Sequence, residues 1–562
     1  MTTTNGTGAS ALIDALAAQG VAYLFGIPGV HTLLPYDLLH DHPSIRAVVT
    51  RHEGGAGFAA DGYARATGRP GVCLVVPGPG STNLATAALV AKSDSVPLVL
   101  ITAAVPDALH GHYAIHELDL VAFMRPLVKM QIQVRHEIGI LDAVTDAFAI
   151  AQAERPGPVH VSIPYDLFGQ RDTSGITDAD RPERGRSPEE GTFLPDAAAL
   201  NTALSLLQNA KAPLIYAGHG VVRADAGAAL VALAESLNAP VVTSNKARGI
   251  IPEDHPLAVG VPSMAGVAAI IRAADVCLAL GTHFNEYTTV TWKMPLPARL
   301  IRVDCDRAAL TMNYPAEVAI PGDVAAIVDW LLERLPADST ATTLAAATAR
   351  LRERRRAALA SFMASESDPT PPFHPRWVAR LLRDAFPPDA IVTSDGSATE
   401  SWLYEPGFTV TRPGSVLVPE VQQTMGYAVG AALGAALGAP DRRALAVVGD
   451  GSLTMALGEL ATIAAMRVPL TICVFNDGQY NALRVRQEAL FDRRYVGTEL
   501  GSLDYAQVAR GLGMRGEKIA TAAQLRAILR DAATRSEPLL LDIPITPEPL
   551  SERYTAVIEA GR

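Results

Sequence analysis

The sequence predicts an α/β protein made of three doubly wound domains, each built on a parallel sheet. Short apolar runs alternate with helical segments along the whole chain, a pattern typical of βαβ units. With 562 residues the chain is too long for one ordinary domain. Polar and proline-bearing breaks divide it into three stretches of roughly 150 residues, a common size for one domain.

The three domains are expected in succession along the chain. The first covers residues 1–168, with strand-like runs such as "GVCLVV" and "PLVLIT", and the polar stretch 170–193 is interpreted as a linker. The second covers residues 194–336 and contains "APLIYAG" and "LIRVDCD". The third covers residues 372–548 and contains "ALAVVG" and "LTICVF".

The composition excludes several classes of protein. A net charge of −11 leaves no basic excess for neutralising phosphates, so nucleic acid is not an expected partner. The N-terminus lacks the basic region and long apolar core of a signal peptide, and no uninterrupted apolar run is long enough to cross a bilayer. We therefore expect a cytoplasmic protein without a membrane span.

Carboxylates follow two apolar runs of the third domain. Asp450 lies in "GDGS" after one strand-like run, and Asp477 lies in "NDG" after the next. Because ligands of open parallel sheets bind beyond the carboxyl ends of the strands, the two side chains are expected to meet there. Two carboxylates and a backbone carbonyl suit Mg²⁺, and glycines before a helix suit a diphosphate. The alternative is a pair of ordinary turns with helix-capping Asp and Asn residues.

A third carboxylate ends a strand of the first domain. Glu53 follows "IRAVVTRH" and enters a helix of small residues. A buried carboxylate without a partner is costly, so Glu53 is a candidate ligand-binding group. The alternative is an ordinary acidic residue in the first turn of a helix, where the helix dipole favours it.

Together these stretches resemble the signatures of the acetohydroxyacid synthase/2-oxo-acid decarboxylase superfamily, whose members use thiamine diphosphate (ThDP). "GDG", 24 further residues and then Asn476 are similar to the diphosphate motif. "RHE" with "GFAADGYARATGRPGVCLVVPGPGSTN" is similar to the pyrimidine-domain motif, and "PEVQQTMGYAVGAALGA" to the segment that bends the cofactor. The resemblance implies a pyrimidine-binding domain, a central domain and a diphosphate-binding domain, in that order.

The resemblance also implies roles for single residues. Glu53 would hydrogen-bond the aminopyrimidine and help to generate the C2 ylide, and Met425 would hold the cofactor bent. The Mg²⁺ ligands would be the Asp450 and Asp477 side chains and the Gln479 carbonyl; many relatives carry two adjacent Asn residues where this chain has Asn476-Asp477. The remaining cofactor contacts would be Gly78, Ser397, Thr399, Gly449, Gly451, Ser452 and Asn476.

Substrate contacts are expected on three segments. Val30 and His31 lie in "FGIPGVHT", which borders the reacting carbon in relatives, and His116 replaces a glutamine that many synthases carry. The loops of His31 and His116 are expected to converge on one pocket, where the two histidines could move protons, although a buried histidine is more often a satisfied core residue. The segment after the second metal motif is expected to form a helix and carries Arg484 and Arg486. One of them, with Arg484 as the named candidate, could pair with a substrate carboxylate, or it could lie on the surface.

The implied reaction is ThDP- and Mg²⁺-dependent cleavage of a C–C bond next to a carbonyl. Decarboxylation of a 2-oxo acid through an ylide and an enamine is the leading hypothesis, and the motifs are most similar to those of 5-guanidino-2-oxopentanoate decarboxylases. An acetolactate synthase-type carboligase, a 2-hydroxyacyl-CoA lyase and a non-catalytic ThDP-fold protein remain alternatives. The sequence shows no clear FAD motif. The resemblance further implies a homodimer or homotetramer with shared active sites.

Overall fold

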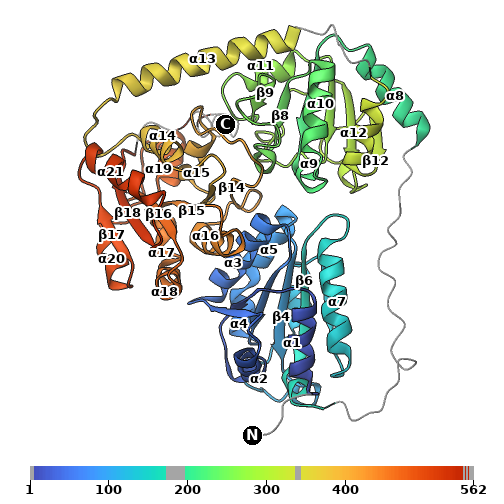
Figure 1. The fold of residues 1–562 in the computed structure, drawn as a ribbon, viewed down its shortest axis with the longest axis vertical. Coiled ribbons are helices and arrows are strands. Elements are labelled where there is room, and N and C mark those ends of the chain that lie inside the picture. The colour runs from blue at the N-terminus through green and yellow to red at the C-terminus, as the bar shows by residue number, and fades with distance from the viewer. Residues whose placement is uncertain (1–5, 172–195, 336–342, 548–550, 552–554, 556–562) are drawn as a thin grey trace.

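Three parallel six-stranded sheets form the framework of the chain (Figure 1). The structure, a computed structural model, describes residues 6–171, 196–335, 343–547, 551 and 555, so most of the predicted linker 170–193 lies outside the described residues. We call 6–171, 196–335 and 343–547 the first, second and third blocks. The sheets and their flanking helices confirm the predicted α/β class.

The first block carries a sheet of order β2-β1-β3-β4-β6-β5. Its strands are β1 Tyr23–Gly26, β2 Arg46–Val49, β3 Gly71–Val75, β4 Leu98–Ala104, β5 Met130–Gln133 and β6 Pro158–Pro164. Its helices are α1 Gly8–Ala18, α2 Leu33–Leu38, α3 Glu53–Thr67, α4 Pro79–Asn83, α5 Ala85–Asp94, α6 Leu120–Met124 and α7 Gly139–Gln152.

The second block repeats the architecture with the order β12-β11-β10-β7-β8-β9. Its strands are β7 Pro213–Ala217, β8 Val241–Thr243, β9 Ala258–Gly260, β10 Val276–Leu280, β11 Arg299–Asp304 and β12 Val318–Pro321. Its helices are α8 Ala197–Gln208, α9 His219–Arg223, α10 Gly227–Leu237, α11 Val267–Arg272 and α12 Val324–Leu332.

The third block has the order β14-β13-β15-β16-β18-β17 and is joined to the second by the long helix α13, Thr343–Ser365, which runs along the outside of the molecule in Figure 1. Its strands are β13 Ile391–Ser394, β14 Val416–Leu417, β15 Ala444–Gly449, β16 Leu470–Asn476, β17 Arg515–Lys518 and β18 Leu539–Pro544. Its remaining helices are α14 Pro375–Ala385, α15 Ala398–Ser401, α16 Ala428–Gly438, α17 Asp450–Thr454, α18 Leu457–Met466, α19 Asn481–Leu490, α20 Tyr505–Gly511 and α21 Ala522–Ala532. No helix in the described part of the chain combines the length and apolarity needed to span a bilayer.

Helices α3 and α16 join the first block to the third, and they lie side by side in Figure 1. Both are rich in glycine and alanine, so their backbones approach closely. A Cβ at Gly434 would overlap the carbonyl oxygen of Ala59, and one at Gly62 would overlap that of Ala431. One continuous apolar core, containing Phe25 of the first block and Leu433 of the third, surrounds this contact.

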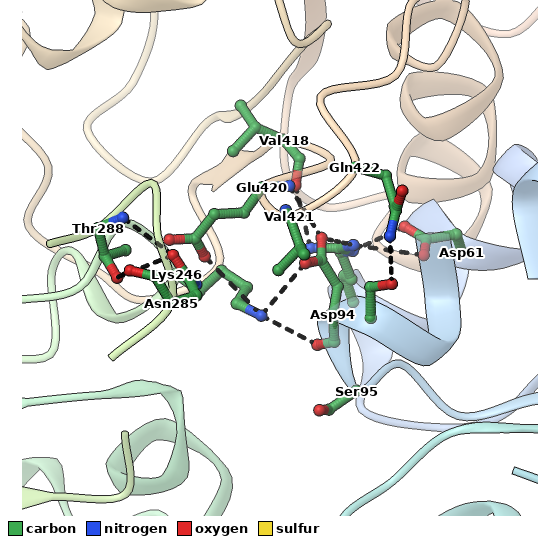
Figure 2. Close-up of polar contacts among 12 residues, drawn as sticks. Asp61, Asp94, Ser95, Lys246, Asn285, Thr288, Val418, Glu420, Val421 and Gln422 are labelled. Carbon is green, nitrogen blue, oxygen red and sulfur yellow. Dashed lines mark hydrogen bonds and ion pairs between the residues drawn. The ribbon is translucent and has the colours of Figure 1, made fainter. Parts of the chain in front are cut away.

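A buried ionic cluster joins all three blocks (Figure 2). Asp94, at the end of α5 and 1% exposed, accepts a hydrogen bond of 2.8 Å from Arg65 and lies 3.4 Å from the Lys246 ammonium of the second block. It also accepts from the backbone N–H groups of Glu420 and Val421 in the third block, at 3.0 and 3.3 Å. Burial alone would raise the pKa of Asp94, but Lys246 and Arg65 lower it, so the carboxylate is charged.

The contact between α3 and α16 predicts the effect of one added methyl group. Gly434→Ala should lower the free energy of unfolding by about 2 kcal/mol, because overpacking displaces two helices whose backbones touch. Gly511→Ala is a matched control: it also changes a helical glycine, but no atom lies within 4 Å of the added Cβ. Urea denaturation midpoints measure both, and equal midpoints for the two variants would contradict the close packing.

Candidate active site

Two predicted metal ligands, Asp450 and Asp477, lie at the carboxyl ends of adjacent strands. Strands β15 and β16 pair in parallel with Gly449 opposite Phe475, which confirms the predicted neighbourhood of their tips. The Asp450 carboxylate accepts hydrogen bonds of 2.8 Å from the N–H groups of Gly451 and Gly478. These bonds fix one carboxylate at the first turn of α17 and tie it to the turn after β16.

The surroundings of both carboxylates raise their pKa values and so disfavour the charged forms. Burial raises the pKa of Asp450 to about 6, and burial followed by the charge of Asp450 raises the pKa of Asp477 to about 7. A buried carboxylate and a half-buried one next to it are stable in their charged forms when a cation is bound nearby. No group of three or more His, Cys, Asp or Glu side chains is arranged for a metal among the described residues, whereas Mg²⁺ takes few ligands from protein.

A cavity of about 530 Å³ opens at these strand ends, and we call it the strand-end cavity. It collects most of the predicted cofactor residues of the third block together with one loop of the second block. The predicted residues in its lining are Ser397, Thr399, Met425, Gly449, Asp450, Gly451, Ser452, Asp477 and Gln479. Two further predictions fall outside it: Asn476 donates to Asp542 at 2.9 Å, and Arg484 stacks on the Tyr495 ring and faces Glu499. Arg486, from the same helix α19, lines the cavity instead.

The segment around Met425 is held by groups that the sequence did not single out. Buried Asp395, at the end of β13, accepts hydrogen bonds from the N–H groups of Tyr427 and Ala428, at 2.6 and 2.9 Å. A Cβ at Gly396 would overlap the backbone of Gln423. The strand end and the segment 423–428 therefore touch along their backbones, and Met425 is presented to the cavity.

A second group of predicted residues gathers in the first block. Glu53 begins α3 and accepts a hydrogen bond of 2.8 Å from the Asn83 side chain. Its carboxylate lies beside Gly80, where a Cβ would stand 3.4 Å from Oε1. Gly78 has a φ of 59°, which favours glycine, and packs against the backbone of His116.

His31 and His116 come together from two separate loops, as the sequence predicted. Their ring centroids are 5.0 Å apart, and the Nδ1 atoms of both are buried without a hydrogen-bond partner among the described residues. Burial, and after it the charge of His116, lowers the pKa of His31. Val30, next to His31, is 83% exposed. None of these first-block residues lines the strand-end cavity of the same chain.

Comparisons with known proteins identify the family. Thiamine pyrophosphate (that is, ThDP) enzyme models match in succession: the N-terminal TPP binding domain over residues 6–123, the central domain over 200–331 and the C-terminal TPP binding domain over 395–543. The chain belongs to the thiamine pyrophosphate enzyme family.

Curated members of this family match over nearly the full chain. A probable acetolactate synthase large subunit of Methanococcus aeolicus is 32% identical over 98% of this chain and 95% of its own length. A probable 2-ketoarginine decarboxylase, AruI, of Pseudomonas aeruginosa is 36% identical over 96% of this chain and 94% of its own. An acetolactate synthase large subunit of Corynebacterium glutamicum is 34% identical over 95% and 86%. This protein is therefore a ThDP-dependent enzyme that acts as a decarboxylase or a carboligase.

The residues of the strand-end cavity fit the diphosphate end of ThDP with a divalent cation. The carboxylate pair supplies hard oxygen ligands that need positive charge. Gly449 and Gly451 bring the start of α17 close to the cavity, and Ser397, Thr399 and Ser452 also line it.

Sequence reasoning missed a residue that holds the Glu53 end in place. Glu459 of α18, 2% exposed, accepts hydrogen bonds from the backbone N–H groups of Arg51 and His52 at 3.0 and 3.1 Å. A Cβ at Gly55 would overlap this carboxylate. The signals available in the sequence were the glycine pair after Glu53 and one Glu in an otherwise apolar helix, and neither names its partner.

Removal of one metal-candidate carboxylate gives a direct test of the site. Asp450→Ala should weaken ThDP binding in the presence of Mg²⁺ by more than about 100-fold. Mutation of a residue that only hydrogen-bonds to a metal ligand already lowers metal affinity or activity by about 10–100-fold, and loss of a ligand should cost more. The matched control is Asp441→Ala, which should bind ThDP normally. Asp441 is exposed and lies just before the N-terminal end of β15, whereas Asp450 follows the C-terminal end. Calorimetric titration of ThDP measures both, and unchanged affinity in Asp450→Ala would remove this carboxylate from the site.

Proposed function

We propose that this enzyme decarboxylates a 2-oxo acid, with 5-guanidino-2-oxopentanoate, that is 2-ketoarginine, as the leading candidate substrate. ThDP supplies a carbon nucleophile and an electron sink when it is bound. The observation that carries the proposal is the pair of imidazoles, His31 and His116, with ring centroids 5.0 Å apart. The name of the AruI relative points to the same substrate class.

The histidine pair favours decarboxylation over ligation for a chemical reason. Simple decarboxylation replaces the carboxyl group by a proton on the same carbon, so a proton donor must stand near it. Carboligation places a second carbonyl carbon there instead. The lowered pKa of His31 favours its neutral form, in which one ring nitrogen carries a proton that it can donate and the other can accept one.

We propose the following roles for the other residues. Glu53 hydrogen-bonds the aminopyrimidine, and Met425 supports the bent cofactor. The Asp450 and Asp477 side chains and the Gln479 carbonyl hold Mg²⁺. Diphosphate and neighbouring contacts come from Gly78, Ser397, Thr399, Gly449, Gly451, Ser452 and Asn476. The domains over 1–168, 194–336 and 372–548 would bind the pyrimidine, complete the pocket and bind the diphosphate.

We also propose that the sites are shared between chains of a homodimer or homotetramer. Support comes from the separation of the predicted residues into two groups: the strand-end cavity is lined by the second and third blocks, while Glu53 and the histidines lie outside its lining. Large apolar side chains are exposed near each group, including Val30 and Ile115 at 83% and 76% in the first block and Val496 at 78% in the third. In a dimer, the first-block group of one chain could lie against the strand-end cavity of the other chain, and the reverse.

A second candidate is favoured by one observation in the second block. An interdomain cavity of about 490 Å³, lined by Arg155, Arg223 and Lys246 among others, meets the strand-end cavity at Asn285, Glu286 and Val421. An anionic nucleotide there would suit a 2-hydroxyacyl-CoA lyase or an FAD-containing synthase. Calorimetric binding of ADP, or a yellow purified protein, would favour this alternative.

A substrate panel separates the candidate reactions. With ThDP and Mg²⁺, the enzyme should release CO₂ from 5-guanidino-2-oxopentanoate at least about tenfold faster than from pyruvate, because the pocket and not the fold sets substrate choice. Pyruvate with acetolactate as its product would instead identify a synthase. Release of CO₂ and formation of ligation products are measured in the same samples.

Mixed subunits test both Glu53 and the shared sites. Glu53→Gln should lower turnover by about 100-fold or more, which is the rate loss typical of removing a group that takes part in proton transfer. Asp450→Ala should be inactive because it does not retain the cofactor. Differently tagged chains carrying one change each, isolated as heterodimers, should recover about half of the wild-type activity, because one of two symmetry-related sites is then intact. Heterodimers that stay as inactive as the single variants would place each site within one chain.

A further inference from the structure

One loop of the second block reaches into the strand-end cavity. Residues Asn285, Glu286, Tyr287, Val290 and Thr291, which follow β10, line it beside Val421 and Gln423. Figure 2 shows Asn285 and Thr288 of this loop beside Lys246 and Glu420 of the buried ionic cluster. The loop is thus placed where the second and third blocks meet, and the exposed side chain of Glu286 puts it at the rim of the cavity.

Glu286 is the acidic residue of this cavity that the proposed metal site does not use. Among the described residues of its lining, the acidic side chains are Glu286, Asp450 and Asp477. The side chain of Glu286 is exposed and has no hydrogen bond or ion pair with the described residues. The hydroxyl of Thr291, five residues further on in the same lining, is buried without a partner. The loop therefore offers a carboxylate and a hydroxyl that nothing within the described chain satisfies.

The loop holds these groups in fixed positions. Asn285 accepts hydrogen bonds from the N–H and the hydroxyl of Thr288, both at 2.9 Å, and the Trp292 indole donates to the Phe284 carbonyl at 3.1 Å. The Tyr287 hydroxyl donates to the buried carboxylate of Glu400. Three successive residues, Val290 to Trp292, have φ angles of 52°, 55° and 54°, which side chains rarely adopt. A costly backbone shape persists only where its surroundings fix it, so the backbone of this loop is held beside the cavity that Glu286 lines.

We propose that Glu286 binds a cationic end group of the substrate and thereby selects 2-oxo acids that carry a guanidinium or ammonium group; this inference rests on the proposed function. A carboxylate can accept two parallel hydrogen bonds from a guanidinium, which gives direction as well as attraction. The reacting end of such a substrate would face the cofactor residues of the strand-end cavity, and its charged end would extend to the rim. The other chain's first block would cover this rim and strengthen the pairing by excluding water.

The position of Glu286 allows one competing role. The same residue also lines the interdomain cavity, together with Lys246 and Arg155. A carboxylate serving that cavity would affect a nucleotide and not the substrate's end group. The experiment must therefore compare substrates that differ in charge alone.

The test uses the ThDP- and Mg²⁺-loaded enzyme with Glu286→Gln and with Glu317→Gln as a matched control, since Glu317 is an exposed Glu of the same block outside both cavities. Turnover is measured with 5-guanidino-2-oxopentanoate and with 5-ureido-2-oxopentanoate, a 2-oxo acid of the same length whose end group is neutral. Glu286→Gln should lower kcat/KM for the cationic substrate by about tenfold or more, mainly through KM, and leave that for the neutral one within about twofold. Glu286→Arg should raise the relative use of 2-oxoglutarate, whose end group is anionic.

A binding arm separates this inference from the proposed function. The probe is 5-guanidinopentanoate, which lacks the oxo group and cannot react, titrated calorimetrically into wild type and Glu286→Gln. Tighter binding to wild type than to the variant supports the inference even if no 2-oxo acid is decarboxylated, an outcome that would overturn only the function. Equal binding, or equal losses of activity for cationic and neutral substrates, would overturn the role of Glu286 and leave the function standing.

Discussion

The buried carboxylate of Asp94 is the point on which the arrangement of the three blocks depends. One side chain of the first block receives the guanidinium of Arg65, lies beside the ammonium of Lys246 from the second block, and accepts two backbone N–H groups from the third. An isolated carboxylate at 1% exposure would be strongly unfavourable. With these partners the charge is retained, and all of them must be in place together. Because Glu420 and Val421 lie directly before the segment that carries Met425, the ionic cluster also sets the wall of the strand-end cavity.

The same constraint explains why the predicted site residues of one chain fall into two groups. Helices α3 and α16 pack backbone against backbone, and Glu459 of the third block holds Arg51 and His52 of the first. These contacts fix the Glu53 end of α3 against the third block at α18, away from the lining of the strand-end cavity. The joint within a chain thus keeps the first-block group apart from the residues that line the strand-end cavity. An assembly of chains can bring the two together with no change of fold.

Local patterns in the sequence were enough to predict the fold class and the pairing of Asp450 with Asp477. Both follow apolar runs that become adjacent parallel strands, so their meeting depends only on strand order. The convergence of His31 and His116 likewise followed from two loops at the same edge of one sheet. Arg484 and Arg486 show where this reasoning ends: two residues on a helix point about 200° apart, and only the packing of α19 decides which one enters the cavity.

Contacts between distant segments could not be predicted, because the type of a side chain does not determine which distant residue it will contact. Glu459 meets residues more than 400 positions earlier, and Asp94 meets the third block 326 positions later. Glu286 belongs to this class, since its position in the cavity arises from the loop of one block resting against a segment of another. Cofactor motifs are local, whereas the rim proposed to meet the far end of a substrate is assembled from the second and third blocks and, in the proposed shared site, from another chain. Relatives with similar motifs and different reactions are the expected result, because a change at the rim alters selectivity without disturbing the strand ends that hold the cofactor.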